Sequence, residues 1–489
     1  MSEPLYLALD QGGHSSRALV LDAIGNTVAK AQVPIHTNAL SDVRIEHKPK
    51  ELVDSLQACC NAIAITLGSD TRRIQQAGLA TQRSSIVCWQ RSDAKPLTPV
   101  LSWQDRRAAN TIARLSDHRP LIESLTGLAM SPHYGASKLH WCLDNEPSVK
   151  TAYREQNLTI GPLASFLARA LTGGDDVCDP ANASRTLLWN RHTRGWSKRL
   201  CALFDIDMTL LPSSVPTRYP YGDLSLGDHR VPLALLTGDQ SAAIYAFGAH
   251  TDGAAYINLG TGAFMQVPIG AQTADVAGLL NSVVFEGNQQ LEYVLEGTVN
   301  GAGRALSWWS ERHGSDPKTL VGTALDSLTH NTDLHARVPV FLNGVSGLGS
   351  PYWLSEFNSQ FIDTQSGDVL SAPDAQSGVI AILDSIVFLL NANLEAAAAH
   401  TGALQQLILT GGLATVDYLC QSLADISGSS TARSTLREAT AKGVGFLLSG
   451  DTQWPGPADL TTFEPGDHLA LRHRHSLWVD AMQNATRAT

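Results

Sequence analysis

The sequence predicts an α/β fold built from two large domains. The chain has 489 residues, which is more than one hydrophobic core usually organises. Apolar runs of strand length alternate with segments of helical periodicity, a pattern typical of mixed sheets with crossover helices. A strand–glycine turn–strand pattern at Leu5–Leu21 returns at Ala254–Val267, roughly 250 residues later. We interpret this return as a duplication of architecture and place the two domains at residues 1–246 and 247–489.

The composition favours a folded protein without a nucleic-acid or membrane partner. Hydrophobic residues make up 43% of the chain and charged residues 17%, which is typical of a globular core rather than disorder. The net charge is −11, with no dense basic run, so we expect no nucleic-acid partner. The longest apolar run, Gly378–Leu390, contains Asp384 and is too short to cross a bilayer, and no signal peptide pattern is present. Seven scattered cysteines without metal-binding spacing fit a reducing compartment, so we expect a cytoplasmic protein without a membrane partner.

The first hairpin surrounds a turn that is rich in glycine and hydroxyl residues. Gly12 and Gly13 can adopt backbone angles closed to other residues, so we expect a tight return of the chain. Such a turn directs several backbone N–H groups into one concavity, which suits a phosphate. Asp10 precedes the turn, and a carboxylate beside bound phosphates is typical of a shared Mg²⁺. An ordinary hairpin with an aspartate at the strand end is the alternative for this stretch taken alone.

Periodicity and turn residues predict the remaining elements. Before the second hairpin we expect a strand at Thr27–Ile35, a helix at Glu51–Leu67, strands at Ile74–Thr81 and Ser85–Gln90, a short apolar run at Val100–Trp103 with a helix starting at 104–107, and helices across 119–171 with breaks at Pro132, Pro147 and Pro162. Residues 175–235 carry prolines and short strands in no clear pattern. Later in the chain we expect a core helix at Ser377–Ala399, a buried strand at Leu404–Thr410 and a helix at 415–427.

One further stretch places an aspartate at the end of a buried strand. An apolar run from Leu235 ends at Asp239, and a helical segment, Ser241–Phe247, follows it. A strand end would hold this carboxylate rigidly, as a general base requires. A capping aspartate at the start of a helix is the alternative for Asp239 taken alone.

An ordered set of motifs from residue 10 to about residue 425 resembles the FGGY carbohydrate kinases and, within them, the glycerol kinase branch. The motifs are Asp10-Gln11-Gly12 with Ser15-Ser16-Arg17-Ala18, Thr81-Gln82-Arg83, Trp103-Gln104-Asp105-Arg106-Arg107, Thr237-Gly238-Asp239-Gln240, Gly260-Thr261-Gly262, Glu296-Gly297, Ala302-Gly303, Gly347–Trp353 and Gly411-Gly412. The resemblance implies two actin-like (ribonuclease H-like) domains, with ATP and a small polyol or sugar in the cleft between them. It also implies an ATP-dependent phosphotransferase that uses Mg²⁺.

The resemblance implies a role for each motif residue. Asp239 would take the proton from the attacking hydroxyl, and Asp10 would reach Mg²⁺. The substrate would contact Asp239 itself and Arg83, Ser84, Trp103, His133, Gln240 and Phe264. ATP would contact Gly12, Gly13, His14, Ser15, Arg17, Gly260, Thr261, Gly303, Gly411 and Gly412, with the phosphates at Gly12–Ser15 and at Gly260-Thr261. A salt bridge for Arg83, a core position for Trp103 and Phe264, and a packing role for His133 are the alternatives.

The chain also departs from the family pattern at several positions. Gly13 and His14 stand where the family has two threonines that help to hold the phosphates, so the grip on ATP is expected to differ. Ser84 replaces a glutamate that accepts hydrogen bonds from glycerol, and His133 aligns with a tyrosine. We therefore expect a substrate other than glycerol.

Two alternative functions remain open. A ketose kinase of the xylulose or ribulose type is the first, although the Met-His pair of the xylulose branch is absent near Arg83. A non-catalytic sensor on the same fold is the second; Gly13-His14 favours it, whereas Asp10 and Asp239 oppose it. The sequence also leaves a homodimer open.

Overall fold

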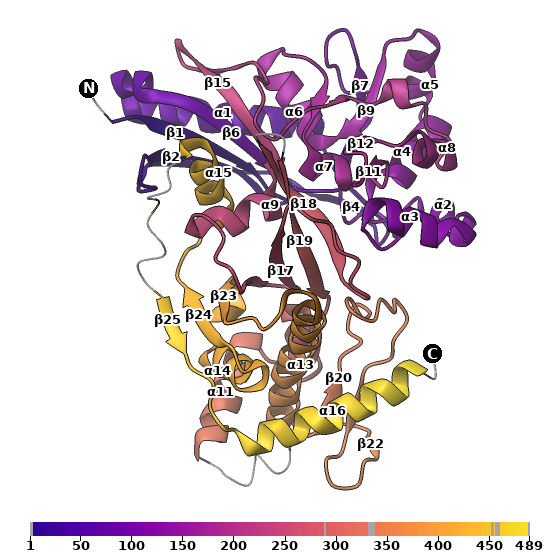
Figure 1. Cartoon of the computed structure of the whole chain (residues 1–489), viewed down its shortest axis with the longest axis vertical. Coiled ribbons are helices and arrows are strands. Elements are labelled where there is room, and N and C mark those ends of the chain that lie inside the picture. The colour runs from indigo at the N-terminus through magenta and orange to yellow at the C-terminus, as the bar shows by residue number, and fades with distance from the viewer. Residues whose placement is uncertain (1–2, 288–289, 331–337, 451–453, 455–459, 488–489) are drawn as a thin grey trace.

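The computed structural model describes residues 3–287, 290–330, 338–450, 454 and 460–487. The chain forms two lobes, each built around one large sheet, and most of the first half of the chain lies in the upper lobe of Figure 1. The second half forms most of the lower lobe, but one of its helices, α15 (Ala439–Ser449), lies in the upper lobe beside β1 and β2. The upper lobe therefore contains residues from both halves of the chain.

The sheet of the upper lobe has the strand order β14-β15-β6-β1-β2-β3. Within it, β1 runs parallel to β6 and β6 runs parallel to β15, while the other neighbours are antiparallel. Parallel neighbours need crossover segments, and α1 (Pro49–Leu67) lies in the segment between β3 and β6. The strands are β1 (Leu5–Gln11), β2 (Ser15–Asp22), β3 (Thr27–Pro34), β6 (Ile74–Thr81), β14 (Asp223–Leu226) and β15 (His229–Gly238).

Both faces of this sheet are buried. Leu7 and Leu9 of β1 pack with α1 and α6 (Leu163–Thr172) in one hydrophobic core, whereas Ala8 packs with α15 in another. Successive residues of a strand point to opposite faces, so a strand that is covered on both sides needs apolar residues at every position. This explains why β1 is a continuous apolar run and not an alternating one.

The sheet of the lower lobe has the strand order β18-β19-β17-β16-β23-β24-β25. Its largest hydrophobic core includes the apolar residues of α13 (Ala375–Thr401), which the sequence predicts as a core helix. The strands are β16 (Ala254–Leu259), β17 (Ala263–Gly270), β18 (Leu280–Gly287), β19 (Gln290–Val299), β23 (Gln406–Thr410), β24 (Ser430–Ser434) and β25 (Leu460–Phe463).

The two sheets share one topology. The order β3-β2-β1-β6-β15 in the first corresponds to β19-β17-β16-β23-β24 in the second. Pairing directions also correspond, since β16 is antiparallel to β17 and parallel to β23, just as β1 is antiparallel to β2 and parallel to β6. The duplication inferred from the two hairpins is therefore present in the structure.

Smaller elements surround the two sheets. A five-stranded sheet contains β4 (Asn38–Ser41), β5 (Arg44–His47), β8 (Val100–Leu101), β7 (Ile86–Gln90) and β9 (Leu158–Pro162), and the remaining strands are β10 (Val177–Cys178), β11 (Trp189–Asn190), β12 (Gly195–Trp196), β13 (Ser213–Ser214), β20 (Val340–Leu342), β21 (Gln360–Ile362) and β22 (Val369–Leu370). The other helices are α2 (Ala109–Arg114), α3 (Arg119–Thr126), α4 (Gly135–Asn145), α5 (Pro147–Arg154), α7 (Pro180–Ser184), α8 (Lys198–Leu203), α9 (Asp239–Ala243), α10 (Gly303–Arg312), α11 (Pro317–His330), α14 (Asp417–Ser427) and α16 (Leu469–Arg487). Short 3₁₀ helices are η1 (Gly68–Arg73), η2 (Ser116–His118), η3 (Met208–Leu210), η4 (Ile244–Phe247) and η5 (Gly412–Thr415).

Two local predictions are wrong. Residues 104–107 are not the start of a helix, which begins at Ala109, because the Asp105 carboxylate accepts hydrogen bonds from the backbone N–H of Ile45 and of Arg107. Within the stretch expected to be helical, β9 is a buried strand that pairs with β7. Tertiary pairing overrides local helical spacing at both places.

Among the residues that the structure describes, two helical segments are long and apolar enough to cross a membrane by length and composition alone, namely Pro49–Arg73 and α13. The apolar run at Gly378–Leu390 lies within α13, which matches the core helix predicted at Ser377–Ala399 to within two residues at each end. In α13, 94% of the most apolar window is buried inside the protein, as in a core helix of a folded domain.

Candidate active site

Three parallel strands bring the principal predicted residues to one edge of the upper sheet. Asp10 lies near the end of β1, Arg83 lies two residues beyond β6, and Asp239 directly follows β15. Because β1, β6 and β15 are adjacent and parallel, their carboxyl ends meet at the same edge. Arg83 Nε lies 4.0 Å from Asp239 Oδ1. The structure therefore assembles these three residues from segments that are far apart in the sequence.

Glu296 connects this edge to the sheet of the lower lobe. It belongs to β19, and its Oε1 accepts hydrogen bonds from Arg83 Nη1 at 2.7 Å and from Gln266 Nε2 at 3.0 Å. Its Oε2 accepts from Arg185 Nη2. Burial raises the pKa of Glu296, but Arg185 and Arg83 outweigh burial and hold it at about 2. The carboxylate thus stays ionised between two buried arginines.

The sequence motifs do not predict roles for all of these residues. Glu296 falls within a family motif but was given no role, and neither Arg185 nor Gln266 was singled out. One signal was present, since Arg185 is the charged residue in an otherwise uncharged stretch, 181–189. A buried charge in such a stretch needs a counter-charge, which here comes from the other half of the chain.

Two carboxyl groups at the strand ends have raised pKa values. Burial raises the pKa of Asp239, while Arg83 and the backbone N–H of Gln240, 2.7 Å from Asp239 Oδ1, oppose the rise. Burial also raises the pKa of Asp10 to about 7; the charge of Asp239 adds to the rise and Arg17 opposes it. A raised pKa makes a carboxylate a stronger base, which suits proton abstraction near neutral pH.

Arg17 lies between two acidic side chains. Its Nη1 is 3.6 Å from Asp10 Oδ2 and 3.5 Å from Glu438 Oε2. Glu438 directly precedes α15, so this contact joins the first hairpin to a helix from the end of the chain. Arg17, predicted to contact ATP, is therefore already paired with carboxylates beside the turn.

The turn of the first hairpin differs from the prediction. Neither Gly12 nor Gly13 adopts a positive φ, so the return of the chain does not depend on angles reserved for glycine. The Gly12 N–H donates to the carbonyl of Ser15 at 3.0 Å and closes the turn itself. An added Cβ at Gly13 would meet nothing within 4 Å, and His14 is exposed. The outer side of the turn is thus open, as a phosphate-binding surface requires.

The second turn brings the predicted ATP-binding residues of the lower lobe together. The carbonyls of Gly260 and Thr261 each accept a hydrogen bond at 3.0 Å, from the backbone N–H of Gly303 and of Arg304, at the start of α10. Gly411 has φ +94, and a Cβ there would collide with the carbonyl of Leu259. Gly412 follows and is open to solvent. ATP contact by these residues stays a prediction.

A second group contains the predicted substrate residues Ser84, Trp103 and His133. Lys138 Nζ donates to the carbonyls of Ser84 at 2.7 Å, Ser102 at 3.0 Å and His133 at 2.9 Å, and so holds three segments together. The rings of Trp103 and His133 are 5.7 Å apart in an edge-on arrangement. Burial, followed by the nearby cations Arg106, Lys138, Arg185 and Arg83, lowers the pKa of His133 well below its ordinary value. The imidazole is therefore neutral at physiological pH.

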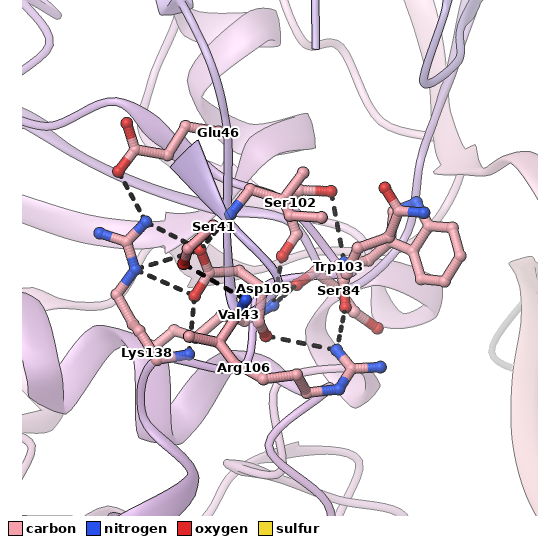
Figure 2. Close-up of polar contacts among 12 residues, drawn as sticks. Ser41, Val43, Glu46, Ser84, Ser102, Trp103, Asp105, Arg106 and Lys138 are labelled. Carbon is pink, nitrogen blue, oxygen red and sulfur yellow. Dashed lines mark hydrogen bonds and ion pairs between the residues drawn. The ribbon is translucent and has the colours of Figure 1, made fainter. Parts of the chain in front are cut away.

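Ser84 has an unusual conformation within this group. Its φ is +63, and its Oγ is buried without a hydrogen-bond partner among the described residues. Lys138 bonds to its carbonyl and helps to hold this backbone conformation. Figure 2 shows Ser84 and Trp103 next to each other, with Lys138 in the same network. Such a side chain is available to a ligand.

The positions of the other two predicted substrate residues, Gln240 and Phe264, follow from the elements that contain them. Gln240 follows Asp239 in α9. Phe264 lies on β17 two residues before Gln266, so both side chains point to the face that meets Glu296. A separate cavity of about 580 Å³, between residues 127–129 and 274–281, contains none of the predicted site residues.

Comparison with known proteins agrees with this arrangement. Residues 5–246 match the N-terminal domain of the FGGY family of carbohydrate kinases, and residues 255–448 match the C-terminal domain. A glycerol kinase from Polaromonas naphthalenivorans is 32% identical over 448 residues, which cover 90% of this chain and 89% of that protein.

Solved structures show the same fold. A glycerol kinase with ADP from Plasmodium falciparum has a TM-score of 0.86 at 23% identity, covering 99% of this chain and 98% of that one. A ligand-bound xylulose kinase from Lactobacillus acidophilus has a TM-score of 0.84 at 19% identity, covering 99% of both chains. The predicted α/β fold with two actin-like domains is therefore confirmed. The chain belongs to the FGGY family of carbohydrate kinases, and it is an ATP-dependent phosphotransferase for a small-molecule sugar or polyol.

Proposed function

We propose that this kinase transfers the γ-phosphoryl group of ATP to a hydroxyl of a polyol or sugar larger than glycerol, with Asp239 as the base. The observation that carries the proposal is the meeting of Asp10, Arg83 and Asp239 at the ends of three parallel strands. Glu296 reaches this point from the other lobe, so the reacting groups would meet between the two domains. The domain boundary between residues 246 and 247 remains part of the proposal.

Asp239 is suited to the proton-transfer step. In this step the Asp239 carboxylate accepts the hydroxyl proton and the hydroxyl oxygen forms a bond to the γ-phosphorus. The bond from the γ-phosphorus to its bridging oxygen breaks, and ADP leaves. Burial keeps the Asp239 pKa above its ordinary value, which strengthens the base, while Arg83 beside it limits the rise.

The two glycine turns would hold ATP, and Asp10 would approach Mg²⁺. Among the described residues no three His, Cys, Asp or Glu side chains gather into a metal group. One carboxylate still fits Mg²⁺, because this ion is usually bound by one or two carboxylates with phosphate oxygens and water. When bound, the ion would neutralise charge on the phosphates. The contacts of Gly12–Ser15, Gly260, Thr261, Gly303, Gly411 and Gly412 with ATP are proposed on the same basis.

The substrate would lie against the group of Ser84, Trp103 and His133. A glutamate at position 84 would place a negative acceptor in this site, and the shorter serine removes it and leaves room. Losing a hydrogen bond to a charged group costs about 1.5–3 kcal/mol, or roughly 10- to 100-fold in affinity. Glycerol is therefore expected to be a poor substrate. Arg83, Gln240 and Phe264 complete the proposed set of substrate contacts.

The change Asp239→Asn tests the proposal. The variant keeps the shape of the side chain but cannot take the proton, so we expect turnover to fall roughly 10²- to 10⁴-fold. ATP-analogue binding, measured by calorimetry, should not change. Asp54→Asn is the matched control, because Asp54 is an exposed aspartate paired with Lys50 on the surface. Near-normal turnover of Asp239→Asn would reject the role of this residue.

Two other functions stay as alternatives. Similarity to a xylulose kinase structure supports a ketose kinase, and the altered Gly13-His14 turn supports a sensor that binds without turnover. Substrate-dependent ADP release across glycerol, erythritol, pentitols and ketopentoses separates the three functions. We place the protein in the cytoplasm, where ATP is supplied, and we propose no nucleic-acid or membrane partner. The proposal is compatible with either a monomer or a homodimer.

A further inference from the structure

Arg106 differs from the other arginines around the candidate substrate site. Arg83 and Arg185 both pair with Glu296, and Arg107 pairs with Glu46 and Asp105. Arg106 Nη1 donates only to main-chain oxygens, those of Trp103 at 2.7 Å and Asp105 at 3.3 Å. Within the described part of the chain, no carboxylate lies within 4 Å of its guanidinium. Figure 2 shows this guanidinium joined to the main chain near Trp103, with its other edge free of marked contacts.

An arginine in this position has an energetic cost. Arg106 is half-buried, and burial lowers its pKa, with Asp105 only partly opposing the effect. A charge taken from water without a counter-ion destabilises a folded protein unless another group compensates for it. The main chain satisfies Nη1 only, which leaves Nε and Nη2 as donors without described acceptors. This edge of Arg106 is thus available to an anion.

Arg106 lies in the group that contains Ser84 and His133. The same Trp103 whose carbonyl binds Arg106 also stacks edge-on with His133, and Arg106 is the nearby cation with the largest influence on the His133 pKa. Lys138 links Ser84, Ser102 and His133 through their carbonyls. The Ser84 Oγ is a second unpartnered polar atom in this group, on a residue that is 5% exposed. Two independent features therefore point to a ligand at this place.

The residue at position 84 does not supply the missing counter-charge. Ser84 is neutral, so it adds no negative charge to the group that contains Arg106. Among the described residues, the group therefore holds a cation that has no carboxylate partner.

We infer that the preferred substrate supplies this anion and is a polyhydroxy acid, an aldonate of four or five carbons, in which Arg106 binds the carboxylate. The planar guanidinium suits a carboxylate through two parallel hydrogen bonds. Ser84 and the neutral His133 are then available to the adjacent hydroxyl groups, while a more distant hydroxyl reacts at Asp239. This inference rests on the proposed function and names the substrate class of the same site.

The experiment compares acids with neutral polyols of equal carbon number. We propose to measure kcat/KM by ADP release for erythronate against erythritol and for xylonate against xylitol, with glycerol and ketopentoses alongside. The acid of each pair should exceed its alditol by at least tenfold. Arg106→Gln should lower kcat/KM for the acid roughly 10- to 100-fold, mainly through KM, and should affect the alditol far less. Arg119→Gln is the control, because Arg119 is a half-exposed arginine paired with Glu123, outside the group.

The possible outcomes separate this inference from the proposed function. An alditol or ketose that exceeds every acid would overturn the inference and leave the kinase assignment intact, and so would preference for a sugar phosphate. ATP binding without ADP release for any candidate would overturn both. If Arg106→Gln does not fold, calorimetry on the wild-type protein with a non-hydrolysable ATP analogue replaces it. Tighter binding of the acid than of the alditol, weakening as salt is raised, would support the inference, and equal binding would contradict it.

Discussion

Glu296 offers the sharpest test of how the two lobes support the site. Its carboxylate lies on a strand of the lower sheet, and it accepts hydrogen bonds from Arg83 and Arg185, which belong to the first half of the chain. The change Glu296→Gln preserves the size of the side chain and removes its charge. Arg185 then keeps its charge without its carboxylate partner, and Arg83 keeps only Asp239, whose Oδ1 lies 4.0 Å from its Nε.

The expected loss of stability follows from this burial. Glu296 is 6% exposed, so water does not replace the lost charge. Breaking a buried ion pair by removing one partner costs about 3–5 kcal/mol. Arg83 also loses the acceptor that fixes its position beside Asp239. We therefore expect both lower unfolding free energy and a KM for the carbohydrate that is higher by roughly tenfold, which corresponds to 1.4 kcal/mol.

A matched control separates stability from site geometry. Asp384 of α13 is also buried and accepts a hydrogen bond from Arg474 Nε at 2.7 Å, but it lies within the lower lobe. Asp384→Asn should lose a similar amount of stability and leave KM unchanged. Denaturant unfolding, followed with two probes because two domains can unfold separately, measures the first quantity and steady-state kinetics the second. If Glu296→Gln unfolds at the wild-type denaturant concentration, or if its KM stays at the wild-type value, the reasoning is wrong.

Three other predictions concern Asp10, Ser84 and the hinge between the two lobes. Burial raises the pKa of Asp10 from its ordinary 3.8 to about 7, so the stability linked to its protonation is present below pH 4 and is lost as pH rises through 7. Asp10→Asn should therefore stabilise the nucleotide-free protein on the order of a few kcal/mol at pH 8 and much less at pH 5, and equal melting shifts at both pH values would contradict this. Ser84→Glu restores the missing acceptor and should shift the specificity ratio towards glycerol by roughly 10- to 100-fold; an unchanged ratio counts against a role for position 84. The lobes should close about a hinge near residues 240–250, so scattering curves should become more compact with ATP analogue and substrate together, and identical curves would argue against closure.

Local pattern was enough to predict the parts of the site that lie at strand ends. The runs before Asp10, Arg83 and Asp239 are apolar because β1, β6 and β15 lie inside the sheet, and that same burial makes them recognisable in the sequence. Strand ends of parallel neighbours meet at one edge, but the structure alone shows that β1, β6 and β15 are such neighbours, so the pattern identified the three residues without placing them together. The tight turn at Gly12 was predicted for a partly wrong reason, because glycine there leaves space and does not supply an unusual φ.

Long-range partners could not be predicted in this way. Glu296 is separated from Arg83 by 213 residues and from Arg185 by 111 residues, and nothing in the local spacing of any of them specifies the others. The contact of Glu438 with Arg17 depends on α15 returning to the upper lobe, which no periodicity indicates. The left-handed backbone of Ser84 also depends on tertiary contact, since Lys138 of α4 binds its carbonyl.

The charges of the site fall into two groups that meet at Asp239. On one side, Asp10 and Arg17 adjoin the open turn of the first hairpin, where the phosphates are proposed to bind. On the other side, Arg83 and Glu296 adjoin the group around His133, where the carbohydrate is proposed to bind. Asp239 is coupled to both groups, since its charge raises the Asp10 pKa and its Oδ1 lies 4.0 Å from Arg83 Nε. A hydroxyl held by the second group and a phosphate held by the first would therefore meet beside this carboxylate, which is where a base has to act for the phosphoryl group to be transferred.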